Sequence, residues 1–182
     1  MLSSNTANRI YLCSEIRIYV RMKKLQKNGL KILKIFHLLF AVMWIGGVLA
    51  LVSLQLGAKP KTAEMMYISA ISHLVVDKWF LIPGGIGIVI TGLIYGLFTN
   101  WGFFKYRWLT VKWALTIVLI ILGVGYMGAT IKANAIYAEQ LLEGAATDLY
   151  WHNVYGVATA GVVQLVGFLC IVIVSVLKNQ RR

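Results

Sequence analysis

Charged residues are scarce in this chain of 182 residues, where they make up only 13% of the composition. A soluble domain averages about 25% charged and about 45–50% apolar residues, whereas this chain is 59% hydrophobic. Disordered chains are rich in charge and poor in apolar residues, so intrinsic disorder is excluded. Only two prolines are present, which excludes collagen-like and proline-rich low-complexity architectures.

Acidic residues and cysteines are also few. The six acidic residues stand against eighteen basic ones, which gives a net charge of +12. In a soluble protein this excess would suggest a nucleic-acid partner. Here the basic residues lie between apolar runs, so we expect no nucleic acid and attribute the charge to membrane orientation. Cys13 and Cys170 lie at opposite ends of the chain without metal-type spacing, so neither a disulfide framework nor a zinc site is indicated.

Four long apolar runs dominate what remains. A helix needs about 20 apolar residues to cross a hydrocarbon core about 30 Å thick. Runs of this length lie at residues 35–56, 79–98, 109–131 and 154–177. Because they are continuous rather than alternating, a β-barrel is disfavoured. The sequence predicts an all-α fold, with residues 31–182 forming a single membrane domain of four transmembrane helices.

The basic residues predict the orientation of these helices. Most of them lie before the first run, between the second and third runs, and after the fourth, whereas most acidic residues lie in the other two connections. Positive charge favours the cytoplasmic side, so we expect both termini in the cytoplasm of a multi-pass protein of the bacterial inner membrane, surrounded by lipid bilayer. Residues 1–30 would form a basic cytoplasmic tail. We interpret residues 1–21 as an upstream extension, because Met22 and two lysines before an apolar run are typical of a start.

The segment before the second run predicts an additional feature. A helix over residues 65–98 would be about 50 Å long, so part of it must lie outside the membrane or along its surface. Four apolar residues share one face of its first half: Met65, Ile68, Ile71 and Val75. This pattern is typical of a short amphipathic helix at the membrane surface. Pro83 and the glycines after it predict a kink or break near the outer end of the second run.

Glycines are common within the runs. Gly92 and Gly96 form a GxxxG pair, and Gly46 with Ala50 forms a looser version. Small residues let helix backbones approach closely in lipid. The pattern predicts close packing of helices, and it leaves a homo-oligomer open.

The three histidines are the side chains best suited to hold a metal or a haem. His37 lies at the inner end of the first run, whereas His73 and His152 lie towards the outer side, on the order of 25–30 Å away. Two histidines on one iron need nitrogens about 4 Å apart. The outer pair is therefore the expected bis-histidine ligand set of a b-type haem. Asp77, one turn after His73, could accept a bond from the second ring nitrogen.

Each of these residues also has an ordinary interpretation. A histidine near the end of a span can be an interfacial polar residue that reaches water, and Lys112 can extend to the inner surface. An ionisable residue inside a span is costly and commonly functional, which favours a role for His37. Lys112 would then bind an anionic group near His37, such as a haem propionate or a quinone oxygen, and Arg107 or Lys34 could join it.

The residues from His37 to Gly47 carry a resemblance to a known group of proteins. Their pattern, H-x6-W-x-G-G, resembles the first span of a bacterial membrane superfamily that includes CopD-type copper-resistance proteins and HemJ-type protoporphyrinogen oxidases. The chain is also similar to a small, uncharacterised bacterial integral-membrane family within that superfamily. Five further segments carry this likeness: Ile82-Pro83-Gly84, Thr91-Gly92-Leu93, Thr99 to Lys105, Arg107-Trp108 and Val111-Lys112-Trp113. The likeness covers residues 31–130 and leaves out the fourth run.

The resemblance implies a compact helical bundle and a haem ligand. In HemJ-type proteins the histidine of the first span helps to bind haem b, which implies this role for His37, and Lys112 resembles a lysine early in their third span. The second and fourth runs depart from the HemJ pattern, which puts protoporphyrinogen oxidation in doubt. Spacing favours the pair His73 and His152, whereas resemblance favours His37. Two haems, one near each face, would reconcile the two.

The sequence thus predicts a membrane protein that binds one or two b-type haems and has an electron-transfer or redox role. It would be a haem-dependent oxidoreductase if it is an enzyme, with a quinone or another redox protein as partner. Two alternatives stay open. One is a cofactor-free accessory or scaffold protein. The other is a transporter of metals or small solutes, which only the broken second helix supports.

Overall fold

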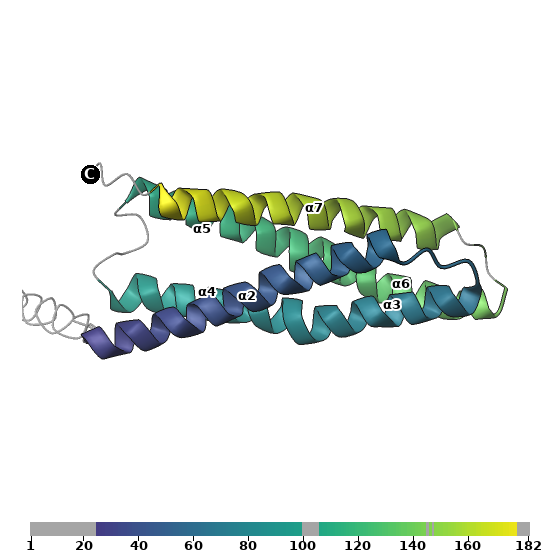
Figure 1. Cartoon of the computed structure of the whole chain (residues 1–182), viewed down its shortest axis with the longest axis horizontal. Coiled ribbons are helices and arrows are strands. Elements are labelled where there is room, and N and C mark those ends of the chain that lie inside the picture. The colour runs from purple at the N-terminus through teal and green to yellow at the C-terminus, as the bar shows by residue number, and fades with distance from the viewer. Residues whose placement is uncertain (1–24, 100–105, 145, 147, 178–182) are drawn as a thin grey trace, which may run out of the picture.

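The computed structural model describes residues 25–99, 106–144, 146 and 148–177. These residues form an all-helical bundle (Figure 1). The elements in chain order are α2 (Lys27–Gly57), α3 (Ala63–Val76), the π-helical turn η1 (Asp77–Leu81), α4 (Ile82–Phe98), α5 (Arg107–Ile120), the π-helical turn η2 (Ile121–Met127), α6 (Gly128–Leu142) and α7 (Asp148–Val176). The interpretation of residues 1–21 as an extension lies outside the described residues.

Within the described residues, four continuous helices are long and apolar enough to cross a membrane, which confirms the predicted bundle. They run over Lys27–Gly57, Ala63–Phe98, Arg107–Leu142 and Asp148–Val176. Neighbours along the chain are antiparallel, so α2 begins and α7 ends at the same end of the bundle (Figure 1). We call this end the terminal end, and the end with the α2–α3 and α6–α7 connections the distal end.

The second helix contains the irregularity that Pro83 predicts. The η1 turn lies just before Pro83, and the Ile82 N–H bonds to the Asp77 carbonyl five residues back. Proline has no N–H and its ring crowds the carbonyl of the preceding turn, so a widened turn accommodates it without ending the helix. Asp77 and Leu81, at the two ends of η1, are both buried.

A second π turn lies in the third helix. Close to it, the Gln164 Nε2 donates a 2.8 Å hydrogen bond to the Leu119 carbonyl, and Gln164 is fully buried. A Cβ on Gly123 would lie only 2.5 Å from that nitrogen. Gly123 therefore provides the space in which an amide of α7 satisfies a backbone carbonyl inside an apolar bundle.

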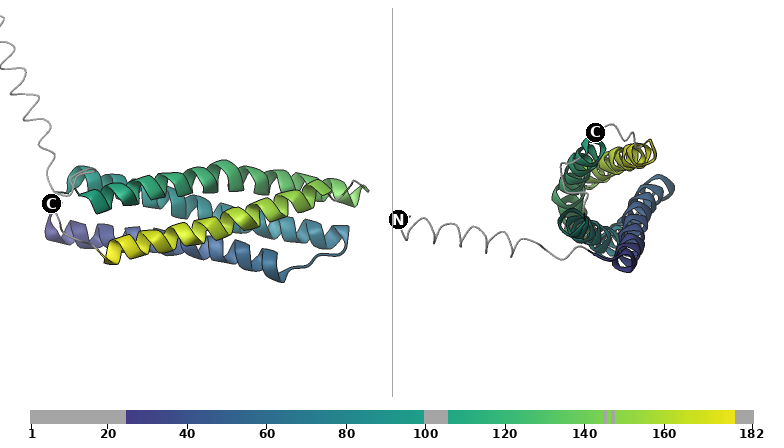
Figure 2. Two further views of the ribbon diagram at one scale, coloured as in Figure 1. Left: turned by 90° about the horizontal axis from the view of Figure 1, so that it is seen from above. Right: turned by 90° about the vertical axis from the view of Figure 1, so that its left-hand side faces the viewer.

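The four helices separate into two pairs at the terminal end. There α4 packs mainly on α2 and α5 mainly on α7, whereas α3, α6 and α7 pack together at the distal end. Viewed from the terminal end, the helices form a C in which these two pairs lie on opposite sides (Figure 2). Trp44 and Phe168, whose ring centroids are 4.9 Å apart, join α2 to α7 between the two ends.

The charge-free segments of the helices indicate which part of the bundle could lie in the hydrocarbon core of a membrane. The second helix has no charge over residues 79–98 and the third has none over 113–131, which are lengths of about 30 Å each. Lys78 and Lys132 end these stretches on the distal side. Because the helices continue for several turns beyond both lysines, α3, most of α6 and the start of α7 extend out of this membrane band.

The part beyond the membrane band has a core of its own. Met66, Ala70, Ala138, Leu141 and Tyr150 form it, separate from the larger cluster around Trp44 and Val48. The helix expected before the second span is thus present as α3, and it continues the second helix along the bundle. Its outward face carries exposed Met65, Ile68 and Val75, whereas His73 lies on the inward face with Met66 and Ala70.

Candidate functional site

His37 lies in the α2–α4 pair near the terminal end. Its Nδ1 is 2.7 Å from the Thr91 Oγ1 on α4, and its ring meets Tyr95 edge to face at 5.7 Å between centroids. Thr91 is buried, and its hydroxyl also lies 2.6 Å from the Gly87 carbonyl. These contacts hold the imidazole at a fixed position inside an apolar span.

The contacts of Thr91 favour one tautomer of His37. A hydroxyl has one hydrogen; when the Gly87 carbonyl accepts it, Oγ1 accepts a bond from the Nδ1–H of His37. The Nε2 of the neutral ring then carries the lone pair. A histidine whose Nδ1–H is held in this way is prepared to bind a metal through Nε2.

A cation lies next to this imidazole. Lys112 on α5 is close enough to His37 to interact with it electrostatically, and its ammonium lies 5.9 Å from the centroid of the Trp108 ring. Trp113 approaches α4 at Gly92, where a Cβ would be 3.2 Å from the indole. The structure therefore brings His37 and Lys112 near one another.

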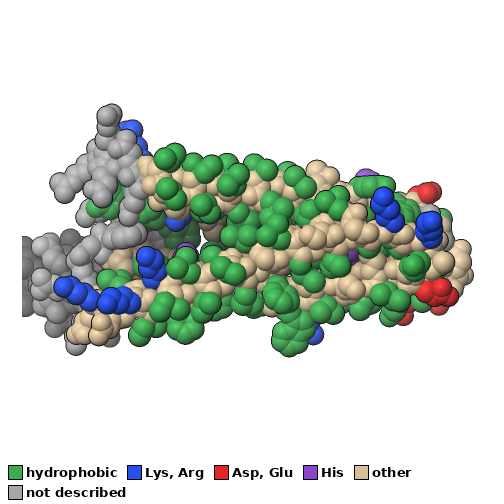
Figure 3. Space-filling model, in the orientation of Figure 1, with side chains coloured by type: hydrophobic (Ala, Val, Ile, Leu, Met, Phe, Trp, Pro, Cys, Tyr) green, Lys and Arg blue, Asp and Glu red, His purple; other side chains and the backbone are tan. Residues whose placement is uncertain are grey.

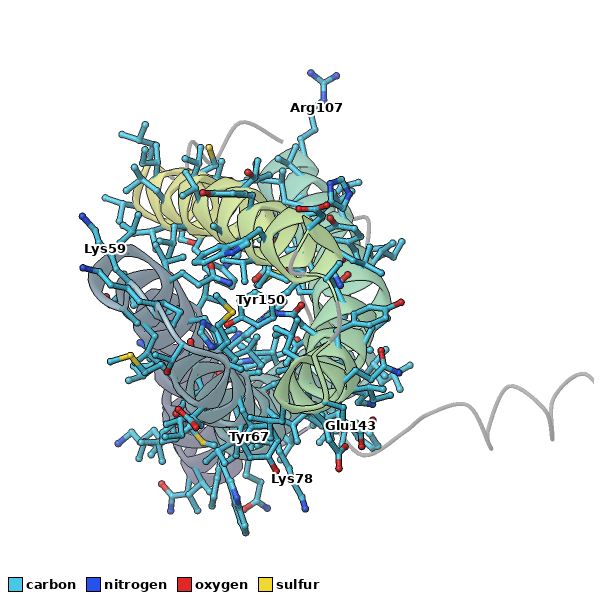
Figure 4. All side chains as sticks on the ribbon, turned by 90° about the vertical axis from the view of Figure 1, so that its right-hand side faces the viewer. Lys59, Tyr67, Lys78, Arg107, Glu143 and Tyr150 are labelled. Carbon is cyan, nitrogen blue, oxygen red and sulfur yellow. The ribbon has the colours of Figure 1, made fainter. Side chains whose placement is uncertain are left out.

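Arg107 does not join this group, although the sequence allowed it. Its side chain is exposed at the start of α5 and points away from the bundle (Figure 4). Lys34 is likewise exposed on α2.

Near the same end the molecular surface is hollowed between the α2–α4 pair and the α5–α7 pair (Figure 3). We call the group formed by His37, Thr91, Tyr95 and Lys112 the terminal site.

The second histidine lies beside a cavity at the distal end. His73 is 7% exposed, and its Nδ1 donates a 2.6 Å hydrogen bond to the Ser69 carbonyl. The cavity has about 10 Å³ open to the centre of a water molecule, which is room for about one water. All four long helices contribute to its lining: Gln55, Ala70, His73, Ile131, Asn134, Tyr150, Asn153, Val154 and Val157.

His152 does not line this cavity. It is exposed on α7, whereas its neighbour Asn153 lines the cavity and Tyr150 is buried. Figure 4, which views the distal end, shows Tyr150 inside the ring of helices, where its hydroxyl donates to the Met66 carbonyl at 3.2 Å. The structure therefore does not bring His73 and His152 to one cavity, and the space beside His73 is far too small for a porphyrin.

Asp77 is buried one turn after His73, but it faces a different neighbour. Its Oδ2 lies near Gly128 on α6, and it interacts electrostatically with Lys132 one turn further along that helix. The Nδ1 of His73 bonds to the Ser69 carbonyl instead of to this carboxylate. Among the described residues, no group of three or more histidine, cysteine, aspartate or glutamate side chains could hold a metal ion.

The polar residues that complete both sites were not among the sequence-predicted ones. Thr91 and Tyr95 surround His37, whereas Gln55 and Asn134 share the cavity with His73. Their signal in the sequence is weak, because an isolated threonine or amide in an apolar run is also explained by a bond between helices.

The chain matches no family model, no curated protein and no solved structure. The likeness to the CopD and HemJ group therefore remains a prediction from its motifs. The functional interpretation depends on the geometry of the two sites.

Proposed function

We propose that this multi-pass membrane protein binds one b-type haem at the terminal site and takes part in electron transfer. His37 would be the iron ligand through Nε2, and a quinone in the lipid or another redox protein would be the electron partner. The observation that carries the proposal is the 2.7 Å contact between His37 Nδ1 and Thr91 Oγ1. It holds the ring and leaves the Nε2 lone pair available to a metal.

The donors at the terminal site fit such a group. Iron in b-type haem takes an imidazole as an axial ligand, and Lys112 offers a positive charge beside His37 for an anionic propionate. The hollowed surface between the two helix pairs lies near this end (Figure 3). When bound, haem would supply one-electron chemistry, while the chain sets its ligand, its charge environment and its exclusion from water.

The distal site does not fit a haem. Its cavity has room for about one water, and His152 is exposed on α7. We therefore propose one haem and leave out the second. The resemblance of residues 37–47 to a haem-binding first span supports the same histidine, and the excess of basic residues supports placing the terminal end in the cytoplasm of a bacterium.

Absorption spectra test this proposal. The protein is purified in mild detergent from cells supplied with haem precursor, and oxidised and dithionite-reduced spectra are recorded for the wild type, His37→Ala and His152→Ala. We expect a Soret band with sharp reduced bands in the wild type and in His152→Ala, and their loss in His37→Ala. A colourless wild type would contradict the proposal and would favour a cofactor-free accessory protein.

A further inference from the structure

Three residues that line the distal cavity each have a buried polar atom without a hydrogen-bond partner among the described residues. The atoms are Gln55 Oε1 on α2, His73 Nε2 on α3 and Asn134 Oδ1 on α6. His73 and Asn134 are 7% and 8% exposed. Buried polar atoms in folded proteins almost always have a partner, so three on one cavity point to a bound molecule.

All three of these atoms are hydrogen-bond acceptors. Since the Nδ1–H of His73 donates to the Ser69 carbonyl, its Nε2 is an acceptor in the neutral ring. The two amide oxygens are also acceptors. With the two amides oriented as they are here, the cavity presents three lone pairs from three helices, and a molecule bound there donates hydrogen bonds.

The size and charge of the distal cavity limit which molecules could bind there. About 10 Å³ open to the centre of a water molecule admits one molecule of that size and excludes organic ligands. The three acceptors are neutral, and Lys132 lies near Asp77, the closest carboxylate along α3 and η1. A buried divalent ion would lack a negative ligand among these three acceptors, so a small hydrogen-bond donor suits the site better.

The position of the site gives such a molecule access. His73 precedes Lys78 by more than a turn, and Asn134 follows Lys132, so both lie beyond the charge-free membrane band on the distal side. Water is available at that level of the bundle. The cavity also lies at the opposite end from His37 and uses none of the residues of the terminal site.

We propose that the distal cavity binds one water-sized hydrogen-bond donor, which links α2, α3 and α6 through Gln55, His73 and Asn134. The chemistry is that of water; an ammonium ion has similar size and also donates, and it is distinguished from water by the salt series below. The site is independent of the proposed haem, so the failure of one proposal leaves the other intact.

An experimental structure of the wild-type protein, at a resolution that shows ordered water, tests the proposal first. We expect density within hydrogen-bond distance of His73 Nε2 and of at least one of the two amide oxygens. A cavity without density would overturn the proposal. Nitrogen-15 spectra of histidine-labelled protein add an independent measurement, since neutral His73 should carry its proton on Nδ1. A proton on Nε2 would also overturn it, because the acceptor set would then be incomplete.

Unfolding midpoints in ammonium, potassium and sodium chloride at equal ionic strength then identify the donor. Equal midpoints, together with density at the site, identify water. A midpoint raised by ammonium alone in the wild type and in the exposed control Gln140→Leu, but not in Asn134→Leu, identifies ammonium. An equal rise with potassium that Asn134→Leu removes would overturn the proposal, because potassium donates no hydrogen bond.

Discussion

His37 and His73 are held in the same way although they lie at opposite ends of the bundle. The Nδ1–H of His73 donates to the Ser69 carbonyl, and the contact of His37 Nδ1 with the Thr91 hydroxyl favours the same tautomer, which leaves Nε2 as an acceptor. The two histidines differ in the residues and the space around them. Lys112 and a hollowed surface lie near His37, whereas two amides and a cavity for about one water adjoin His73.

Replacing Thr91 tests the role of its hydroxyl. Thr91→Val keeps the shape of the side chain but removes the acceptor of the His37 Nδ1–H, so the ring loses its fixed tautomer. We expect haem affinity to fall about 10–100-fold, the usual effect of losing such a supporting bond. Haem titration of the purified apoprotein measures this. Thr91→Ser should restore most of the affinity, and equal affinity in all three proteins would exclude the positioning role.

Gly84 tests the close approach of α2 and α4. A Cβ at this position would lie 2.7 Å from the Trp44 backbone nitrogen, so the helices would have to move apart. We expect Gly84→Ala to destabilise the protein by about 1–3 kcal/mol, as overpacking commonly does. Unfolding in detergent measures the change. At Gly85 a Cβ would meet nothing within 4 Å, so Gly85→Ala should unfold like the wild type; an equal loss in both variants would refute the packing argument.

At the residue scale, the sequence indicates how deep in the membrane a residue lies, but not whether its side chain faces into the bundle. Depth along the helices predicts that His37 lies near Lys112, and that His73 and His152 lie at similar levels. Whether a side chain faces inward depends on the rotation of its helix, and that rotation is set by packing. For this reason Asn153, rather than His152, lines the cavity. Gln55 and Asn134 could not be singled out, because amides occur in membrane helices for packing alone.

At the scale of elements, the helices are longer than the apolar runs. The second run was predicted at residues 79–98, and the helix extends over Ala63–Phe98. Hydropathy locates the part that suits lipid, whereas a helix ends only where its backbone is interrupted. No glycine or proline lies between Ala63 and Ile82. Pro83 interrupts the pattern of backbone hydrogen bonds, and the helix continues through the interruption by way of the wider η1 turn.

Cysteine labelling tests where the second helix leaves the membrane. Ile68 and Ile90 are 64% and 52% exposed on α3 and α4, but only Ile90 lies within the charge-free band. With Cys13 and Cys170 replaced by serine, a water-soluble maleimide should modify Ile68→Cys and leave Ile90→Cys unmodified in membranes, because the reactive thiolate forms in water. Detergent-denatured samples, in which both should react, serve as the control. Protection of Ile68→Cys in membranes would mean that α3 is covered by lipid or by another chain.

At the scale of the whole molecule, the structure places the start of α2 and the end of α7 at one end (Figure 1). The sequence predicts which side of a membrane this end faces, because most basic residues lie before the first span, between the second and third spans, and after the fourth, whereas most acidic residues lie in the other two connections.

Labelling of intact cells tests this orientation. In the same serine background, an impermeant maleimide should modify Lys61→Cys in whole cells and Gln26→Cys only after lysis. Both positions are exposed, at the distal and terminal ends respectively. The reverse pattern would place the terminal end outside the cytoplasm.

The central claim, that the imidazole of His37 ligates haem iron at the terminal site, is tested most directly by chemical replacement of that ring. His37→Gly removes the ligand and leaves a space of imidazole size next to Thr91 and Tyr95. We expect His37→Gly to be purified without haem, and to regain a Soret band and reduced bands when haem and free imidazole are supplied together. Haem retained by His37→Gly without imidazole, at the wild-type amount, would contradict the claim.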